Sequence, residues 1–287
     1  MKVDDAFHGI TTLVGVTTPE GSAQATGFYY QRLTTADPTK DSQWRQVEKT
    51  WLVTNRHVAL PRVRGVEAAP STFAFHLRRV DGTELRWDPI TLDCDELLSR
   101  ARFHPNPDVD VCVIEVLDLL TEKIKDQAAR YQAWFAMHTD QLPGKNNITV
   151  EVADEAVVIG YPRGFYDHVH LFPIVKAGII ASRWGAPFQG KPYFLIDAKL
   201  FPGSSGSIVV SKPQSLAIVD GRIMYAAERQ FAFLGIYSGE PFLQETPLEF
   251  EDMTIVRRSG FNVGIVWYGH LVDEIIDSGV PFPSGSG

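Results

Sequence analysis

The stretch Trp51–Leu60, WLVTNRHVAL, decides the fold because it places His57 directly after a short apolar run. Two later stretches have the same form: PDVDVCVIEV contains Asp110, and FPGSSGSIVV contains Ser205. Short β-branched or aromatic runs indicate strands, so each polar residue lies where a rigid sheet can hold it. A hydroxyl becomes a useful nucleophile when an imidazole takes its proton and a carboxylate fixes the imidazole tautomer. The three stretches therefore predict nucleophilic chemistry at a serine.

These stretches resemble the motifs of the chymotrypsin-fold (trypsin-like) serine proteases, most closely the bacterial HtrA-like branch. The segment Thr54–Val58, TNRHV, is similar to the histidine motif of the family, and Asp110 opens an apolar run as the family's aspartate does. The segment Gly203–Ser207, GSSGS, follows the motif Gly-x-Ser-Gly-Gly except at its last position. Weaker similarities extend over most of the chain in the family's order, at 160–162, 177–180, 197–198 and 235–237.

The resemblance implies a role for each of these residues. His57 would be the general base, Asp110 would orient its imidazole, and Ser205 would be the nucleophile that forms an acyl-enzyme. The backbone amides of Gly203 and Ser205 would form the oxyanion hole. The glycines at 203 and 206 also allow an irregular backbone whose amides turn toward a ligand.

Neighbouring residues compete for two of these roles. Asp108 lies on the same side of a strand as Asp110, but Asp110 directly precedes the apolar run. Ser204 adjoins Ser205, and the frame Gly-x-Ser-Gly selects Ser205. An α/β-hydrolase would need Gly-x-Ser-x-Gly and the chain order Ser, acid, His, whereas this chain has Ser207 at the last position and the opposite order. Ser207 places a side chain where the family has its second glycine, so the sequence does not decide whether the loop around Ser205 has the geometry needed for full activity.

The resemblance also points to a specificity pocket, for which two interpretations are equally good. Lys199 lies where trypsin-like enzymes often place the residue at the pocket base, and a lysine there would favour an acidic side chain before the cut. Alternatively, Lys199 faces solvent and Phe201 leaves an apolar pocket. An extended peptide would pair with a strand edge. The predicted substrate-binding residues are Lys199, Leu200, Phe201, Pro202, Ser238, Gly239 and Glu240.

Many short strand-like runs with Gly and Pro between them indicate an all-β fold. The resemblance implies two six-stranded antiparallel β-barrels, chymotrypsin-like, with an inter-barrel helix and a C-terminal helix. The protease domain would span residues 1–280, with the first barrel over about 5–117 and the second over about 145–267. The residues 281–287 resemble a disordered tail.

Individual elements follow from apolar spacing. Apolar residues three or four apart predict a helix over Leu117–Met137, and a second helix is expected over about Tyr268–Ile276. The stretch Arg86–Pro107 shows no clear pattern, and Thr34–Lys49 is expected to be a polar hairpin or loop. The predicted strands are 10–16, 27–30, 52–53, 72–77, 111–116, 148–150, 156–159, 173–180, 193–196, 207–210, 231–237 and 262–267.

Composition narrows the possible partners and location. The chain has 27 basic and 35 acidic residues and a net charge of -8, and it has no Lys/Arg-rich run, so we expect no nucleic-acid partner. Two cysteines, Cys94 and Cys112, cannot form the disulfide framework of secreted relatives. The first residues are too acidic and polar for a signal peptide, and no apolar run is long enough to cross a membrane. The sequence therefore predicts a cytoplasmic protein with no membrane attachment.

We expect neither a cofactor nor a metal. His168 and His170 share one face of a possible strand, but no third or fourth ligand is apparent nearby in the sequence. The predicted function is therefore that of a serine endopeptidase acting on protein or peptide substrates. Two alternatives stay open. The chain is a pseudoprotease or binding module with weak turnover, or it is a protease activated by a regulatory partner, for example in a bacterial stress or defence system.

Overall fold

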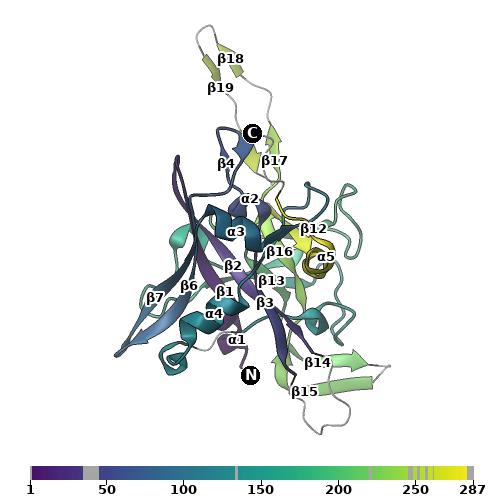
Figure 1. Ribbon diagram of the computed structural model, residues 1–287. Helices are drawn as coiled ribbons and strands as arrows, with labels where there is room; N and C mark the ends of the chain where they lie inside the picture. Colours follow the sequence, from purple (N-terminus) through teal and green to yellow (C-terminus); the bar gives the residue numbers. More distant parts are fainter. Residues whose placement is uncertain are drawn as a thin grey trace.

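The chain folds into two β units with short helices around them (Figure 1). The computed structural model describes residues 2–34, 45–132, 135–219, 222–244, 248–250, 253–255, 258–260 and 262–282. The first half of the chain forms a seven-stranded antiparallel sheet, and the second half forms a closed six-stranded antiparallel barrel. The all-β, chymotrypsin-like fold expected from the sequence is confirmed, with one closed barrel.

The N-terminal sheet has the strand order β7-β6-β1-β2-β3-β9-β8. In β6 the apolar residues alternate with polar ones, so one face of this strand packs into the core. The sheet has one strand more than the predicted barrel and is not closed by hydrogen bonds between the described residues. Its strands are β1 (Thr11–Thr18), β2 (Gly21–Leu33), β3 (Val47–Thr54), β6 (Thr72–Asp81), β7 (Glu84–Leu92), β8 (Ala101–Phe103) and β9 (Cys112–Glu115).

The C-terminal barrel closes in the order β10-β11-β12-β21-β16-β13. Its interior is the larger of the two apolar cores, and it joins residues of β2 and β3 such as Phe28 and Val53. Its strands are β10 (Glu155–Gly160), β11 (Ile174–Ile180), β12 (Tyr193–Asp197), β13 (Ile208–Ser211), β16 (Phe233–Gly239) and β21 (Val263–Tyr268). The predicted strand at 148–150 is wrong, because Ile148 and Val150 pack into the core from irregular backbone.

In the described part of the chain, four two-stranded sheets lie outside these units, and those of the C-terminal half project from the body of the molecule (Figure 1). The β14–β15 hairpin projects at the opposite end of the molecule from α2 and the β18–β19 hairpin. The strands are β4 (Arg62–Val63) with β5 (Val66–Glu67), β14 (Gln214–Val219) with β15 (Arg222–Gln230), β17 (Phe242–Gln244) with β20 (Arg258–Gly260), and β18 (Leu248–Phe250) with β19 (Met253–Ile255).

The helices are short and lie between or beside the strands. They are α1 (Val3–Ile10), α2 (Arg56–Ala59), α3 (Cys94–Arg100), α4 (Leu117–Ile124) and α5 (His270–Ser278), with 3-10 turns η1 (Ala128–Arg130), η2 (Thr139–Gln141) and η3 (Pro162–Gly164). The C-terminal helix is confirmed. The described part of the chain holds no helix of the length and apolarity needed to span a membrane.

The predicted helix over Leu117–Met137 is wrong beyond Ile124. The backbone leaves the helix at Lys125, and Asp126 adopts a left-handed φ of 59°. Tyr131 then forms a bridge with Arg79 of β6. The apolar residues at helical spacing therefore cover the sheet from an irregular segment, because pairing with β6 outweighs the local helical preference.

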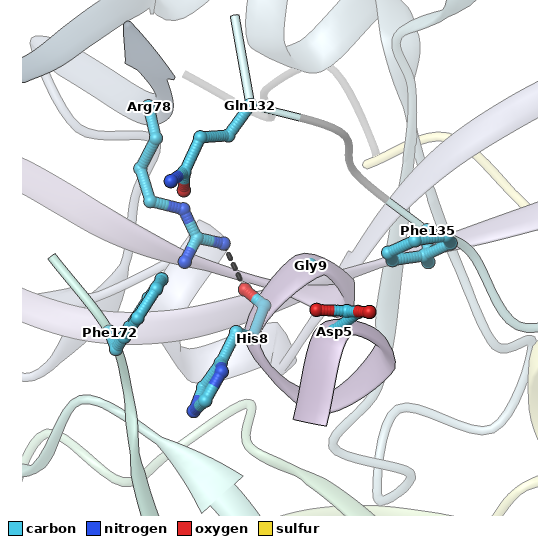
Figure 2. A pocket seen from close by; sticks show the side chains of 7 residues that line it. All are labelled: Asp5, His8, Gly9, Arg78, Gln132, Phe135 and Phe172. Carbon is cyan, nitrogen blue, oxygen red and sulfur yellow. Dashed lines mark hydrogen bonds between the residues drawn. The ribbon is translucent and has the colours of Figure 1, made fainter. Parts of the chain in front are cut away.

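Arg78 of β6 ties the N-terminal sheet to α1. Its guanidinium donates to the carbonyl oxygens of His8 and Thr11 at the end of that helix. Figure 2 shows it between Phe172 and the last turn of α1, and it lies 5.7 Å from the centre of the Phe172 ring. A cation at a helix C-terminus stabilises the helix through its dipole, so this buried arginine has a structural partner.

Candidate active site

His57 and Asp110 are brought together by adjacent strands, β3 and β9. β3 ends at Thr54, and His57 follows in the short helix α2. Asp110 lies two residues before the start of β9, which pairs with β3 from Thr54 to Trp51. The fully buried side chain of Asn55 donates from Nδ2 to the Asp110 carbonyl oxygen at 2.7 Å. The two catalytic candidates are therefore fixed by the sheet and by a direct bond between their segments.

The Asp110 carboxylate accepts three hydrogen bonds. The backbone N–H of His57 donates to Oδ1 at 2.9 Å, and its ring Nδ1 lies 2.7 Å from Oδ2. The hydroxyl of Ser238 donates to Oδ2 at 2.5 Å. A carboxylate at Nδ1 holds a proton there and leaves Nε2 as the acceptor. Asp108 instead forms an exposed ion pair with Lys191 at 3.1 Å, so the structure brings Asp110 and not its rival to His57.

The pKa of His57 is raised above its usual 6.5. Burial by itself lowers the pKa, but the hydrogen bond to Asp110 and the charge of that carboxylate raise it by more. The imidazole is still reachable, since 48% of its side chain is exposed. A base of this kind can accept a proton near neutral pH and return it later.

Ser205 lies on a loop that leads into β13, between two glycines with left-handed backbone. Gly203 has φ 89° and Gly206 has φ 81°. A Cβ at Gly203 would lie 2.5 Å from the backbone nitrogen of Arg163, and one at Gly206 would lie 2.0 Å from the carbonyl oxygen of Thr26. Both positions therefore require glycine for their conformation and for their close contacts.

The peptide planes around Ser205 are held by hydrogen bonds to their carbonyl oxygens. The Pro202 carbonyl accepts from Arg163 N at 2.7 Å, which fixes the plane that carries the Gly203 amide. The C=O and N–H groups of a trans peptide point in opposite directions. The Gly203 N–H therefore points away from the backbone of Arg163.

The amide of Ser205 is fixed in the same way. The Ser204 carbonyl accepts from Ser207 N at 2.9 Å, so the plane that carries the Ser205 amide has a defined orientation. Within the described ranges, neither the Gly203 amide nor the Ser205 amide donates a hydrogen bond. Two fixed, unused donors next to a serine hydroxyl are what an oxyanion needs.

The Ser205 hydroxyl donates to the carbonyl oxygen of Ser238 at 3.1 Å. In the part of the chain that the structure describes, it has no hydrogen bond to His57. Ser205 is half-buried, whereas its rival Ser204 is only 2% exposed. The hydroxyl of Ser205 is thus the accessible one, and a rotation about its Cα–Cβ bond would be needed for it to leave Ser238.

Ser238 takes part in the site through two groups, its hydroxyl on Asp110 and its carbonyl on Ser205. The sequence predicts Ser238 only as part of the strand edge that pairs with substrate. A serine at the end of the apolar run in β16 is common, so the motif carries little signal for its contact with Asp110.

Ser207, which replaces the family's second glycine, is accommodated by Gly160. A Cβ at Gly160 would lie 2.0 Å from the Ser207 hydroxyl oxygen. That hydroxyl is buried and has no hydrogen-bond partner among the described residues. We call residues 203–207 the nucleophile loop. Glycine at position 160 leaves room for the Ser207 side chain, so the backbone of this loop accommodates the serine.

The predicted pocket residues lie on the segment before the nucleophile and at the end of β16. Lys199 is exposed, and its carbonyl accepts a hydrogen bond from the ammonium group of Lys176. The same ammonium lies 5.0 Å from the centre of the Phe201 ring. The exposure of Lys199 favours the interpretation in which this residue faces solvent. Leu200 is buried, Phe201 and Pro202 are exposed, and Ser238, Gly239 and Glu240 are half-buried.

The two histidines that shared a face in the sequence have other partners. The His170 ring nitrogen Nδ1 lies 2.8 Å from Asp167, and its ring stacks on Phe172. His168 packs against Tyr166. Both cysteines are free thiols, and Cys112 is buried in the N-terminal core.

Comparison with known families agrees with this geometry. Residues 25–218 match the family described as the trypsin-like peptidase domain, which is more than half of the chain. The chain belongs to the trypsin-like peptidases and is a serine protease, a hydrolase of peptide bonds. No curated protein matches it.

Several solved structures, described as proteases or a protease paralogue, are similar to this chain at low sequence identity. The Rv3671c protease from M. tuberculosis, in its active form, has 14% identity and a TM-score of 0.44, over 98% of this chain and 86% of that one. The protease Anisep from Arthrobacter nicotinovorans has 12% identity and a TM-score of 0.47, over 94% of both chains. The scabies mite inactivated protease paralogue S-I1 has 12% identity and a TM-score of 0.47, over 96% of this chain and 97% of that one.

Proposed function

We propose that the chain is an endopeptidase that cleaves protein or peptide substrates through an acyl-enzyme on Ser205. The observation that carries this proposal is the pair of fixed, unused amides at Gly203 and Ser205 beside the half-buried Ser205 hydroxyl. The bonded pair of His57 and Asp110 lies just after β3 and just before β9, and His57 supplies a base. The assignment to the HtrA-like branch is a finer prediction from the sequence motifs.

The proposed reaction begins with rotation of the Ser205 hydroxyl from Ser238 toward His57 Nε2. The oxygen attacks the scissile carbonyl carbon while Nε2 takes the hydroxyl proton, and Asp110 stabilises the imidazolium that results. The Gly203 and Ser205 amides donate to the oxyanion. The C–N bond then breaks as His57 returns the proton to the leaving amine. In the second half of the reaction, water attacks the acyl carbonyl carbon while His57 takes one of its protons. The bond between the acyl carbon and Ser205 Oγ then breaks, His57 returns the proton to Oγ, and the acid is released.

A fluorophosphonate probe tests this proposal directly. We expect one covalent adduct, which mass spectrometry of the digested protein locates on Ser205. Ser205→Ala should abolish both labelling and peptide cleavage without unfolding, since it removes a single oxygen. Ser204→Ala is the matched control and should label at close to the normal rate. If labelling survived in Ser205→Ala and were lost in Ser204→Ala, the nucleophile would be Ser204 and not Ser205.

A second candidate is a protease activated by a regulatory partner, and one observation favours it. The Ser205 hydroxyl bonds to the Ser238 carbonyl and not to His57. A partner that displaces the Ser238 carbonyl would release the hydroxyl for attack. Probe labelling that is slow for the isolated chain and faster in a cytoplasmic extract would support this candidate and the proposed cytoplasmic location. Equal rates would argue against a partner. The pseudoprotease alternative predicts no labelling in either case.

A further inference from the structure

Thr26 of β2 reaches from the N-terminal sheet into the nucleophile loop of the other unit. It is fully buried. Its backbone N–H donates to the Ser205 carbonyl at 2.9 Å, and its hydroxyl donates to the Gly203 carbonyl at 3.2 Å. One residue therefore holds the loop on both sides of the peptide that carries the Ser205 amide.

The hydroxyl of Thr26 has a fixed orientation. It accepts a hydrogen bond from Tyr161 N at 2.9 Å, so its own proton is directed to the Gly203 carbonyl. The carbonyl of Thr26 in turn accepts from the Thr54 hydroxyl at 2.9 Å. Every polar group of Thr26 is thus paired, and the residue is held by its own sheet as well as by the barrel.

The Gly203 carbonyl belongs to a glycine, and its peptide plane is held by the Thr26 hydroxyl at the carbonyl and by a 3.0 Å bond from Ser204 N to the Phe201 carbonyl at the amide. Glycine has no Cβ and adopts several backbone conformations at little cost. If the plane following Gly203 rotated, a carbonyl oxygen could point to the place where an oxyanion forms, and the neighbouring amides would change direction. A hydrogen bond from a rigid strand raises the cost of that rotation.

We propose that Thr26 is a positioning residue, whose hydroxyl holds the oxyanion-binding amides of Gly203 and Ser205 in their productive orientation. This inference rests on the proposed function, because it assigns those amides to a transition state. Thr26 itself would not touch the substrate. Its effect should appear in the rate of acylation and hardly in the binding of the ground state.

The test compares Thr26→Val with a matched change elsewhere in the N-terminal sheet. Valine keeps the shape and the backbone N–H of residue 26 but removes the hydroxyl. Thr12 is the control: it is 1% exposed, and its hydroxyl donates to the His76 carbonyl at 2.6 Å and accepts from His76 N at 3.0 Å. Thr12→Val therefore removes a hydroxyl that is equally buried and equally paired, away from the nucleophile loop.

We expect Thr26→Val to lower kcat for a peptide substrate about 10- to 100-fold, less than the loss of a whole oxyanion donor, with KM unchanged within about twofold. Inhibition by a peptide aldehyde, which places an oxyanion on Ser205, should weaken by the same factor, whereas inhibition by the product peptide should not change. Thr26→Ser should restore most of kcat. Thr12→Val should lower the melting temperature without this loss of kcat.

Equal kcat for Thr26→Val and Thr12→Val, or parallel weakening of aldehyde and product peptide, would overturn the positioning role. If Thr26→Val does not fold, Thr26→Ala, which adds no bulk, takes its place with the same criteria. Failure of the proposed function looks different, because the wild-type chain itself would then neither label with a fluorophosphonate nor cleave peptides.

Discussion

At the scale of single residues, the carboxylate of Asp110 determines the state of His57. It accepts from the His57 backbone and lies 2.7 Å from the ring nitrogen Nδ1. The ring thus has one orientation and one tautomer. The hydroxyl of Ser238 holds the same carboxylate from the other side. The charge and bond from Asp110 leave the pKa of His57 above 6.5 in spite of burial.

This arrangement predicts the pH profile. A raised pKa means that His57 is protonated, and so unable to act as a base, below and somewhat above pH 6.5. We expect kcat/KM to be low at pH 6 and to rise with a midpoint above 6.5. Asp110→Asn should move that midpoint downward, because the raising interactions are lost, and should lower kcat by about 10³- to 10⁴-fold through the wrong tautomer. Initial rates between pH 5 and 9 measure both effects.

Asp108→Asn is the control for this change. Asp108 is exposed and paired with Lys191, so its loss should leave the midpoint and kcat nearly unchanged. Equal losses from both aspartates would show that the orienting carboxylate has been assigned to the wrong residue.

Sequence motifs located the residues that are brought together in the site but not those that hold them. His57, Asp110 and Ser205 each stand in a recognisable frame next to an apolar run. Ser238, Thr26 and Gly160 contact the site across 33 to 179 positions of sequence, and each is a common residue in a common strand context. Such contacts depend on which strands pair, which no local pattern specifies.

At the scale of elements, the sequence predicts the strands with strong apolar alternation, but it predicts neither the strands nor the helix in the segment before Asp110. The stretch 86–107 contains most of β7, all of α3 and β8. β7 alternates charged and apolar residues at the edge of the sheet, and its charges obscured the pattern. α3 did carry a local signal, since Asp93 and Glu96 form a capping box in which each side chain accepts from the other residue's backbone N–H.

The capping box predicts a modest loss of stability without loss of function. Asp93→Ala removes the side chain that accepts from Glu96 N at 2.9 Å and should lower the free energy of unfolding by about 1 kcal/mol. Asp95→Ala removes the same charge from the same turn without removing a cap, and should cost less. Urea unfolding measures the difference, and kcat should stay unchanged in both variants. An Asp95→Ala effect as large as that of Asp93→Ala would refute the capping argument.

At the scale of the whole molecule, the nucleophile loop belongs to the barrel but takes its shape from both units. Thr26 and Thr54 of the N-terminal sheet lie against Gly206, directly after Ser205. His57 and Asp110 lie in segments that adjoin β3 and β9 of that same sheet, and Ser238 lies in β16 of the barrel. The relative position of the two units therefore controls the site, and a small displacement would affect the base and the nucleophile together.

Gly206→Ala tests this dependence. The new Cβ would lie 2.0 Å from the Thr26 carbonyl oxygen and 2.5 Å from the Thr54 hydroxyl, both in the N-terminal sheet. Moving the backbone of β2 or β3 costs much free energy, so we expect the N-terminal sheet and the barrel to separate slightly instead. We expect loss of peptide cleavage by more than about 100-fold and a clear drop in melting temperature.

Gly82→Ala separates this clash from backbone strain alone. Gly82 also has a left-handed φ, 65°, but a Cβ there would meet nothing within 4 Å. It should cost about 1 kcal/mol of stability and leave kcat unchanged. If Gly206→Ala behaved like Gly82→Ala, the loop would not depend on close contact between the units. Because left-handed backbone is common to both glycines, we attribute any larger loss of stability at Gly206 to its close contact with the neighbouring sheet.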